Sequence, residues 1–251
     1  MMILAATTLA IVLPAVACGA DATSVLAGPR QRIETADYRI VGRMVRVDAN
    51  GARTNFSVTL KAHWFGGVLR LVLDVTSPQP SRLRLLMEMR PNGQIGMKIA
   101  HPGDKVLADL PFDQWASGPF GPAFTYEDLL NPEFYWPNQS TENAKYGARD
   151  CDLLTSKPKP EDRTHYAQVR TWLDHRIAFP VHEEKTLKGS GAVKEFSFIG
   201  LRREGGVWSA TQIESKLRGQ NGSTLFLLER GSAKANLKTT DFSAGSLLKF
   251  Q

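Results

Sequence analysis

Apolar and polar residues alternate along most of the chain. In the segment after residue 52, the apolar positions are Phe56, Val58, Leu60, Ala62 and Trp64. The same period continues with Leu71 and Leu73 in the next segment, and it recurs with Leu85 and Met87 in the one after. A period of two residues is typical of strands that bury one face. We therefore expect these in-phase residues to lie on one side of a single sheet.

Turn dipeptides separate the alternating segments. Asn50-Gly51, Asn92-Gly93 and Asn221-Gly222 each stand between two of them, and Asn-Gly is a strong hairpin signal because both residues tolerate positive φ. No long helical period intervenes, so sequence neighbours are expected to pair. The pattern predicts a mainly β (α+β) fold, in which one antiparallel meander of about eleven strands forms a single domain over residues 21–251.

Residues 101–147 interrupt this pattern with Pro, Gly and aromatic residues. Only residues 126–130 look helical, with Thr125 as the N-cap and with Glu127 and Asp128 in the first turn. A break of this length inside a compact domain is typical of a lid or a binding loop. We predict that the insertion is a lid whose aromatic rings bury against the open face of the sheet. The alternative is that it is a permanently packed half of the core.

The N-terminus resembles an export signal. Residues 3–16 form an apolar run that is too short to span a bilayer and is typical of the core of a signal peptide. We predict that residues 1–20 are a signal peptide and that the chain reaches an oxidising compartment. Cys18 allows two interpretations. It is either the lipidated cysteine of a bacterial lipoprotein, which would give membrane contact, or a plain cysteine that is kept or removed on cleavage.

Composition excludes several classes of protein. Hydrophobic residues make up 42% of the 251 residues and the net charge is +6, which rules out intrinsic disorder. Two cysteines are too few for a disulfide-dense mini-protein. Arginines such as Arg82 and Arg84 alternate with apolar residues, as expected of a solvated strand face. No basic tail is present, and we expect no nucleic-acid partner.

The sequence offers little catalytic chemistry. The five histidines lie at no metal-ligand spacing, and no nucleophile elbow or dinucleotide-binding glycine motif occurs. The pair Glu183-Glu184 is interpreted as solvated surface, and Glu127-Asp128 as charge at a helix N-terminus. We therefore expect no catalytic residue, no metal and no cofactor, and a binding protein rather than an enzyme.

The apolar face is larger than a simple core needs. It either packs against a helix or a second sheet, or it forms a concave surface for an acyl chain, where Met and Leu give adaptable contacts. The candidate lipid-binding residues are Leu60, Trp64, Leu71, Leu73, Leu85, Met87, Met97, Phe124 and Leu129.

Four segments carry a resemblance to a known family. Residues 118–129 read G-P-F-G-P-A-F-T-Y-E-D-L, a Gly-rich run into a short helix. The others are residues 167–184, 205–214 and 239–247. In this order and spacing they resemble the outer-membrane lipoprotein-sorting family, the relatives of the periplasmic carrier LolA and its acceptor LolB.

The resemblance implies a strongly curved antiparallel sheet, an unclosed barrel with short helices over its concave face, and a cavity that holds acyl chains. It implies a monomer that binds lipid or lipoprotein acyl chains and works with an inner-membrane exporter. The expected location is the periplasm, or the outer membrane if Cys18 is lipidated. An alternative role is a sensor or accessory protein of an envelope exporter. One departure from the family is expected: residues 30–35 offer about two helical turns at best.

Overall fold

The structure is a computed structural model that describes residues 21–204 and 206–250. The predicted signal peptide and Cys18 lie outside the described residues. The strands are β1 (Asp37–Val47), β2 (Arg53–Phe65), β3 (Val68–Ser77), β4 (Leu83–Met89), β5 (Ile95–Ala100), β6 (Ala108–Asp109), β7 (Asn138–Tyr146), β8 (Arg149–Lys157), β9 (Tyr166–Asp174), β10 (Pro180–Leu187), β11 (Val193–Glu204), β12 (Val207–Leu217) and β13 (Ser223–Ser232). The helices are α1 (Ala22–Glu34), η1 (Gln79–Ser81), η2 (Phe112–Gln114), η3 (Tyr126–Leu129), η4 (Pro132–Tyr135), η5 (Thr239–Phe242) and α2 (Ala244–Leu247).

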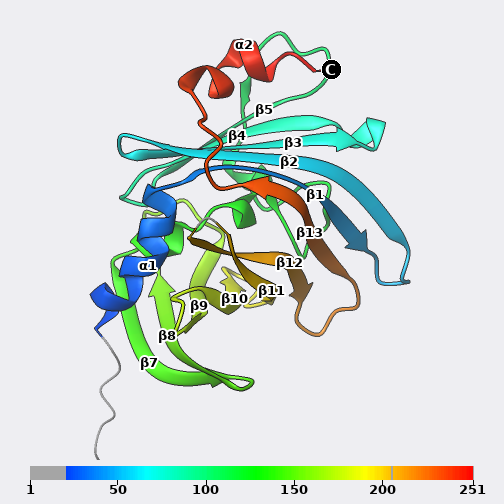
Figure 1. The fold of residues 1–251 in the computed structure, drawn as a ribbon. Helices are drawn as coiled ribbons and strands as arrows, with labels where there is room; N and C mark the ends of the chain where they lie inside the picture. Colours follow the sequence, from blue (N-terminus) through cyan, green and yellow to red (C-terminus); the bar gives the residue numbers. More distant parts are fainter. Residues whose placement is uncertain (1–20, 205, 251) are drawn as a thin grey trace, which may run out of the picture.

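All thirteen strands of the described chain form one antiparallel sheet, in the order β6-β5-β4-β3-β2-β1-β13-β12-β11-β10-β9-β8-β7 (Figure 1). The edge strands β6 and β7 each pair with one neighbour only, so the sheet does not close into a barrel. The pairing of β1 with β13 joins the N-terminal and C-terminal halves of the chain. The predicted meander of mainly neighbouring strands in one unclosed sheet is therefore confirmed.

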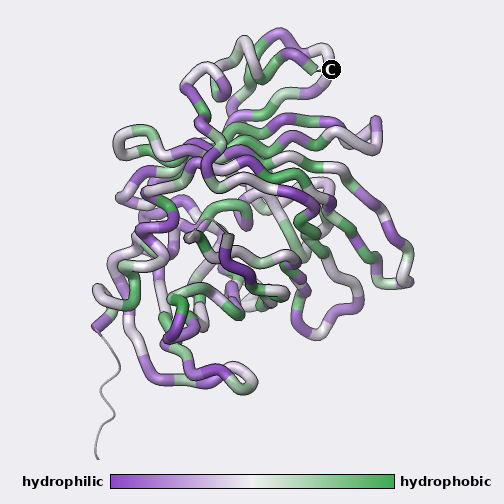
Figure 2. Tube along the Cα trace, in the orientation of Figure 1, coloured by the Kyte–Doolittle hydropathy of each residue, from purple (hydrophilic) through white to green (hydrophobic). Residues whose placement is uncertain are grey.

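The predicted count of about eleven strands was wrong. Both additional strands, β6 and β7, lie inside the insertion at 101–147, where no strand was expected. Strand β6 is a two-residue bridge to β5. Strand β7 is polar along its length and buries neither face (Figure 2). A solvated edge strand needs no apolar alternation, so its sequence carries no period-two signal.

Helix α1 is longer than the two turns expected. It spans 13 residues and contains Pro29, which in a sequence argues for a helix boundary. Tertiary packing overrides this preference, because Val25 and Leu26 bury against Leu154 and Leu173 of the sheet. None of the helices in the described residues is both long and apolar enough to cross a membrane.

The main hydrophobic core lies on the concave face of the sheet. Its register confirms the predicted phase: Leu60 of β2 is opposite Leu73 of β3, which is opposite Leu85 of β4. The helices η2, η3 and η4 of the insertion lie over this face, and α1 lies beside them (Figure 1). Helix α2 lies elsewhere, on the convex side of β3 and β4. Short helices therefore cover both faces, where only the concave one was expected.

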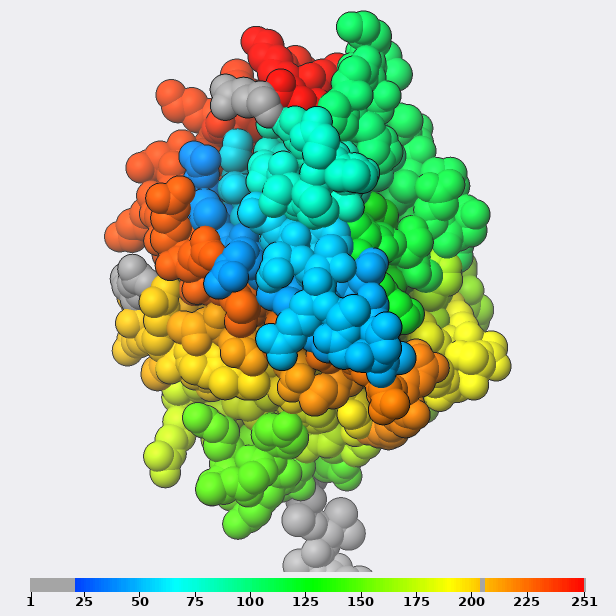
Figure 3. All heavy atoms as spheres, turned by 90° about the vertical axis from the view of Figure 1, so that its right-hand side faces the viewer, coloured from blue at the N-terminus to red at the C-terminus, as the bar shows by residue number. Residues whose placement is uncertain are grey.

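Two hairpin turns, β1–β2 and β12–β13, contact each other at one end of the sheet. Figure 3 shows the tip of the β1–β2 hairpin (blue) beside the β12–β13 turn (orange). Gly222 lies so close to the Val47 carbonyl oxygen that a Cβ atom at this position would be 2.7 Å away from it. This close approach, together with a positive φ of 99°, requires glycine in the turn that the Asn-Gly dipeptide predicted.

Candidate functional site

The predicted lipid-binding residues all lie in one place, on the concave face. Each belongs to the main core or packs against it. Fully buried are Leu71, Leu73, Leu85, Met87, Met97 and Phe124. Leu60, Trp64 and Leu129 keep partial exposure. The structure thus brings the predicted set together, most of it beneath the insertion.

The insertion covers the apolar half of the concave face with aromatic rings. Phe120 is fully buried and stands between Phe56 of β2, at 5.3 Å, and Phe124, at 6.2 Å between ring centroids. Trp115 is also buried, and its indole N–H donates to the Leu110 carbonyl oxygen at 3.0 Å. The prediction that these rings bury against the open face is confirmed. In the structure they are part of the core.

One end of the apolar face is not fully covered. Five side chains there are only partly buried while packing on the core, and we call them the open end: Ile40, Leu60, Phe198, Ile213 and Leu228. They come from five strands that meet where the two halves of the chain join, namely β1, β2, β11, β12 and β13. Of this set, only Leu60 is among the residues predicted from the sequence. A bulge at Glu229, which the pairing of β13 with β1 skips, interrupts the alternation of β13 next to Leu228 and hides its signal.

The rest of the concave face, on β9, β10 and the first residues of β11, is polar and charged. Asp128 of the insertion lies at its centre. One carboxylate oxygen accepts hydrogen bonds from the Lys194 ammonium at 2.7 Å and from the Thr125 backbone N–H at 2.8 Å. The other oxygen accepts a hydrogen bond from the Tyr166 hydroxyl. Every one of these residues is buried, so the insertion is anchored to the sheet by a buried ion pair.

Glu127 makes a second anchor next to the first. Its carboxylate accepts hydrogen bonds from the Thr164 hydroxyl and from the backbone N–H of His165. The same carboxylate lies 2.8 Å from Nδ1 of the His165 ring, which stacks on Phe112 with centroids 4.2 Å apart. Adjacent acidic residues of η3 therefore bind different segments: Asp128 binds β9 and β11, and Glu127 binds the loop that precedes β9. The prediction that Thr125 caps a helix with both acidic residues in its first turn is confirmed, since Asp128 closes a capping box with Thr125; the further hydrogen bonds and ion pairs of the two carboxylates were not predicted.

Three further buried charges complete what we call the ionic cluster: Glu133, Glu183 and Lys185. The Lys185 ammonium lies 3.8 Å from Asp128 and 3.9 Å from Glu183. Glu183 had been interpreted as solvated surface, yet it is 1% exposed. It faces the concave side with Thr171, while its neighbour Glu184 faces outward. Lys185 and Lys194 stand directly opposite each other on β10 and β11. Both lysines stand at positions that face the core, and this is the sequence signal that could have revealed the ionic cluster.

The pKa values within the cluster reflect burial and charge together. Burial works to raise the pKa of Asp128, but the two lysines outweigh it and the pKa falls below its usual value. Burial raises the pKa of Glu183 to about 8. Burial opposes the charged form of Lys185, and the surrounding acidic residues, of which Glu133 contributes most, nevertheless raise its pKa. The cluster therefore holds protonated and ionised carboxyl groups side by side at neutral pH.

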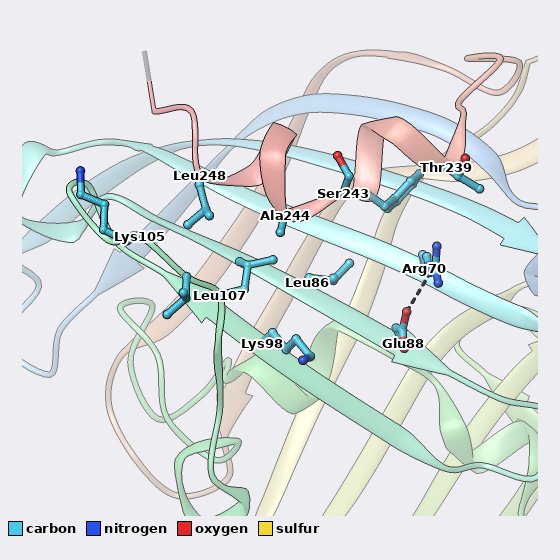
Figure 4. A pocket seen from close by; sticks show the side chains of 12 residues that line it. Arg70, Leu86, Glu88, Lys98, Lys105, Leu107, Thr239, Ser243, Ala244 and Leu248 are labelled. Atoms are coloured by element: carbon cyan, nitrogen blue, oxygen red, sulfur yellow. Dashed lines mark hydrogen bonds and ion pairs between the residues drawn. The ribbon is translucent and has the colours of Figure 1, made fainter.

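One surface pocket lies away from these residues, and another is lined by Phe112, Thr164 and His165 beside the Glu127 anchor. The one in Figure 4 has a volume of about 560 Å³ and lies between α2 and the convex side of β3–β5. Its floor includes Leu86 and Leu107, and Lys98 and Lys105 stand at its edge. In the described part of the chain, no three His, Cys, Asp or Glu side chains are placed to share a metal ion.

The chain is similar to known proteins in sequence and in fold. A family model, described only as a "-like" uncharacterized protein, matches residues 117–249, which is just over half of the chain. The chain belongs to the family that this model describes. It superposes on an outer membrane lipoprotein-sorting protein domain from Vibrio parahaemolyticus with a TM-score of 0.79 and 19% identity, covering 91% of this chain and 100% of that one.

Two further solved structures share the fold of this chain. A DUF1329 family protein from Desulfovibrio piger gives a TM-score of 0.78 at 14% identity, covering 90% of this chain and 97% of that one. A LolA superfamily protein from Nitrosomonas europaea gives 0.66 at 14% identity, covering 90% and 99%. No curated protein matches the chain. The resemblance stated from sequence motifs is therefore confirmed at the level of the fold.

The ionic cluster generates a first prediction. Replacement of Asp128 by Asn leaves the buried ammonium groups of Lys194 and Lys185 facing a neutral amide. We expect the free energy of unfolding to fall by about 3–5 kcal/mol, measured by urea denaturation. Lys194→Met in the same chain should restore part of the loss. Asp109→Asn, at an exposed ion pair with Lys98, should cost less than ~1 kcal/mol. A loss for Asp128→Asn as small as this would contradict the anchoring role.

The raised pKa of Glu183 generates a second prediction. Its carboxyl keeps a proton in the folded protein up to about pH 8 but loses it near pH 4.3 when unfolded. The stability from this group is therefore present at low pH and falls as the pH rises to 8, on the order of 1 kcal/mol per pH unit. Glu183→Gln should flatten this fall in urea denaturation, and Glu184→Gln should not. A difference between wild type and Glu183→Gln that stays constant from pH 5 to 9 would contradict it.

Proposed function

We propose that this LolA-like protein binds lipid, or the acyl chains of lipoproteins, on its concave face and serves in their transport or sorting to the outer membrane. No catalytic step is part of this role. The observation that carries the proposal is the apolar concave face itself, which is continuous from β5 to β13 and ends in the partly exposed open end.

The open end supplies the first contact for a hydrocarbon chain. Ile213 lies opposite Phe198 on one side and opposite Phe226 on the other, and Phe226 is buried in the core. A chain that enters at the open end therefore meets apolar side chains without a break. Each buried CH₂ contributes about 0.8 kcal/mol, so one long acyl chain can gain roughly 8–12 kcal/mol before ordering costs.

Deeper binding requires the insertion to move. Leu71, Met87 and Met97 are buried beneath it, so an acyl chain reaches them only if rings such as Phe120 leave. The ionic cluster makes such a movement a change between two defined states, because charges buried together are costly to separate singly. In this proposal the insertion is the lid that the sequence predicted, held closed while no lipid is bound.

The same proposal places the protein in the bacterial envelope. Export by the predicted signal peptide would bring it to the periplasm, and lipidation of Cys18 would anchor it to the outer membrane. An inner-membrane exporter is the partner that this role calls for.

The filled concave face favours a second candidate function. Trp115, Phe120 and Leu130 are as buried as any core residue, which suits a sensor or accessory protein of an envelope exporter that carries no lipid. The two functions differ in whether lipid occupies the protein.

Native mass spectrometry of protein purified from envelope extract distinguishes them. We expect bound lipid on the wild type and at least a tenfold lower bound fraction on Ile213→Glu, because a carboxylate at the open end opposes entry of hydrocarbon. The matched control is Ile199→Glu. This residue lies on the adjacent strand, faces the opposite side of the sheet and is 43% exposed.

Circular dichroism should show both variants folded. Lipid-free wild type would favour the accessory role. Equal lipid occupancy in both variants would place the lipid elsewhere than the open end.

A further inference from the structure

The sheet splits between β12 and β13. The ladder joining them consists of four residue pairs, from Gln212–Leu227 to Ser215–Thr224. Both strands continue beyond it, over residues 207–211 and 228–232. In that region β12 stays paired with β11, and β13 stays paired with β1. The two strands therefore diverge from this point, each following its other neighbour (Figure 1).

Glycines on both sides of the split fit this divergence. Gly42 lies in β1 at a bulge opposite Leu228, and a Cβ atom there would overlap the Leu227 carbonyl oxygen. Gly200 lies in β11 with φ of 65°, and a Cβ atom there would overlap Thr211 Oγ1. Both glycines stand at the level where the ladder ends. Irregular backbone, at Gly200 in β11 and at the Glu229 bulge in β13, thus lies at the level of the split on both of its sides, as expected of a built feature.

The split exposes two strand edges that face each other. Neither residues 207–211 nor residues 228–232 find a ladder partner across the split in the described structure. Backbone N–H and C=O groups at such edges need hydrogen-bond partners. A hydrocarbon chain offers none, whereas an extended polypeptide can add as a strand. The edges therefore fit a peptide and not a lipid tail.

The two sides of the split differ in chemistry. On the concave side lie apolar residues of the open end, among them Phe198, Ile213 and Leu228. On the convex side lie Arg39 and Arg230, which belong to adjacent strands, and no acidic side chain of the described residues forms an ion pair with either. The nearby Glu229 is already paired with Arg43 at 2.6 Å. The convex side thus presents uncompensated positive charge beside free strand edges.

We infer that the split binds the polypeptide part of an acylated cargo, as an extended, acidic segment that directly follows the lipidated residue. The acyl chains lie on the concave face, and the peptide passes between β12 and β13 to the convex side, where Arg39 and Arg230 meet its carboxylates. This inference rests on the proposed function, because it assumes that acyl chains bind the concave face.

The test compares two synthetic triacylated peptides that differ only in charge. Each carries a lipidated Cys and a Ser, followed by four Glu in one and four Lys in the other. We expect the Glu peptide to bind at least tenfold more tightly at low salt, measured by quenching of protein fluorescence, and the difference to shrink as salt rises. Arg39→Gln with Arg230→Gln should reduce the preference to less than threefold. Arg90→Gln, an exposed cation at the β4–β5 turn, is the control and should leave it unchanged.

Hydrogen exchange supplies a readout of strand addition. Amides of residues 207–211 and 228–232 should gain protection with the Glu peptide, and should not with a diacyl phospholipid that has no peptide. Equal affinity for both peptides, or a preference for the Lys peptide, would overturn the inference while leaving lipid binding intact. Failure of both peptides and of the phospholipid to bind would overturn the proposed function, and the inference with it.

Discussion

The buried ion pair between Asp128 and Lys194, 2.7 Å apart, is the interaction on which the rest of the concave face depends. It fixes η3 against β11, and so decides where the aromatic residues before η3 can pack. A buried pair of this kind adds little net stability compared with apolar packing, but it is costly to break on one side only. Its main effect here is to allow one placement of the insertion, because only in that placement are Asp128, Lys185 and Lys194 all compensated.

The sheet therefore has two kinds of concave surface with different roles. From β5 to β13 the surface is apolar and receives the rings of the insertion. From β9 to β11 it is polar and holds the insertion by charge. Helix α1 adds a third attachment, since the Arg30 guanidinium donates to the Phe134 carbonyl oxygen at 2.8 Å. The insertion thus rests on non-covalent contacts beside an apolar face, and the proposed lid requires these contacts to open.

Sequence reasoning was accurate where a residue's neighbours determine its environment. The alternation of β2, β3 and β4 predicted the phase of Leu60, Leu73 and Leu85, because one buried face imposes a period of two. The alternation did not reveal β7, because this edge strand is solvated on both faces and its residues are mostly polar. It also shortened α1, because Pro29 is a local signal that packing overrides. These errors follow from tertiary contacts that no local pattern contains.

The candidate site, too, could be predicted only where local patterns determine it. The candidate residues on the strands and in the insertion do gather on one face. The ionic cluster was not predicted, because residues far apart in the sequence form it and each looks like ordinary surface charge alone. Glu183 is an example: it lies beside Glu184 in the sequence, but the two face opposite sides of the sheet. The open end was likewise hidden, since Ile213 and Leu228 meet only after the two halves of the chain pair.

Hydrogen exchange of the insertion with and without a long-chain phospholipid tests most directly whether it is a lid. The backbone amides of Tyr126 and Glu127 donate to carbonyl oxygens of Ser117 and Trp115 within the insertion, so their exchange reports its opening. The account predicts that they exchange faster than amides of β2 and β3 in the lipid-free protein, and that they slow when lipid is added. Equal, strand-like protection in both conditions would show that the insertion is static core and would contradict the account.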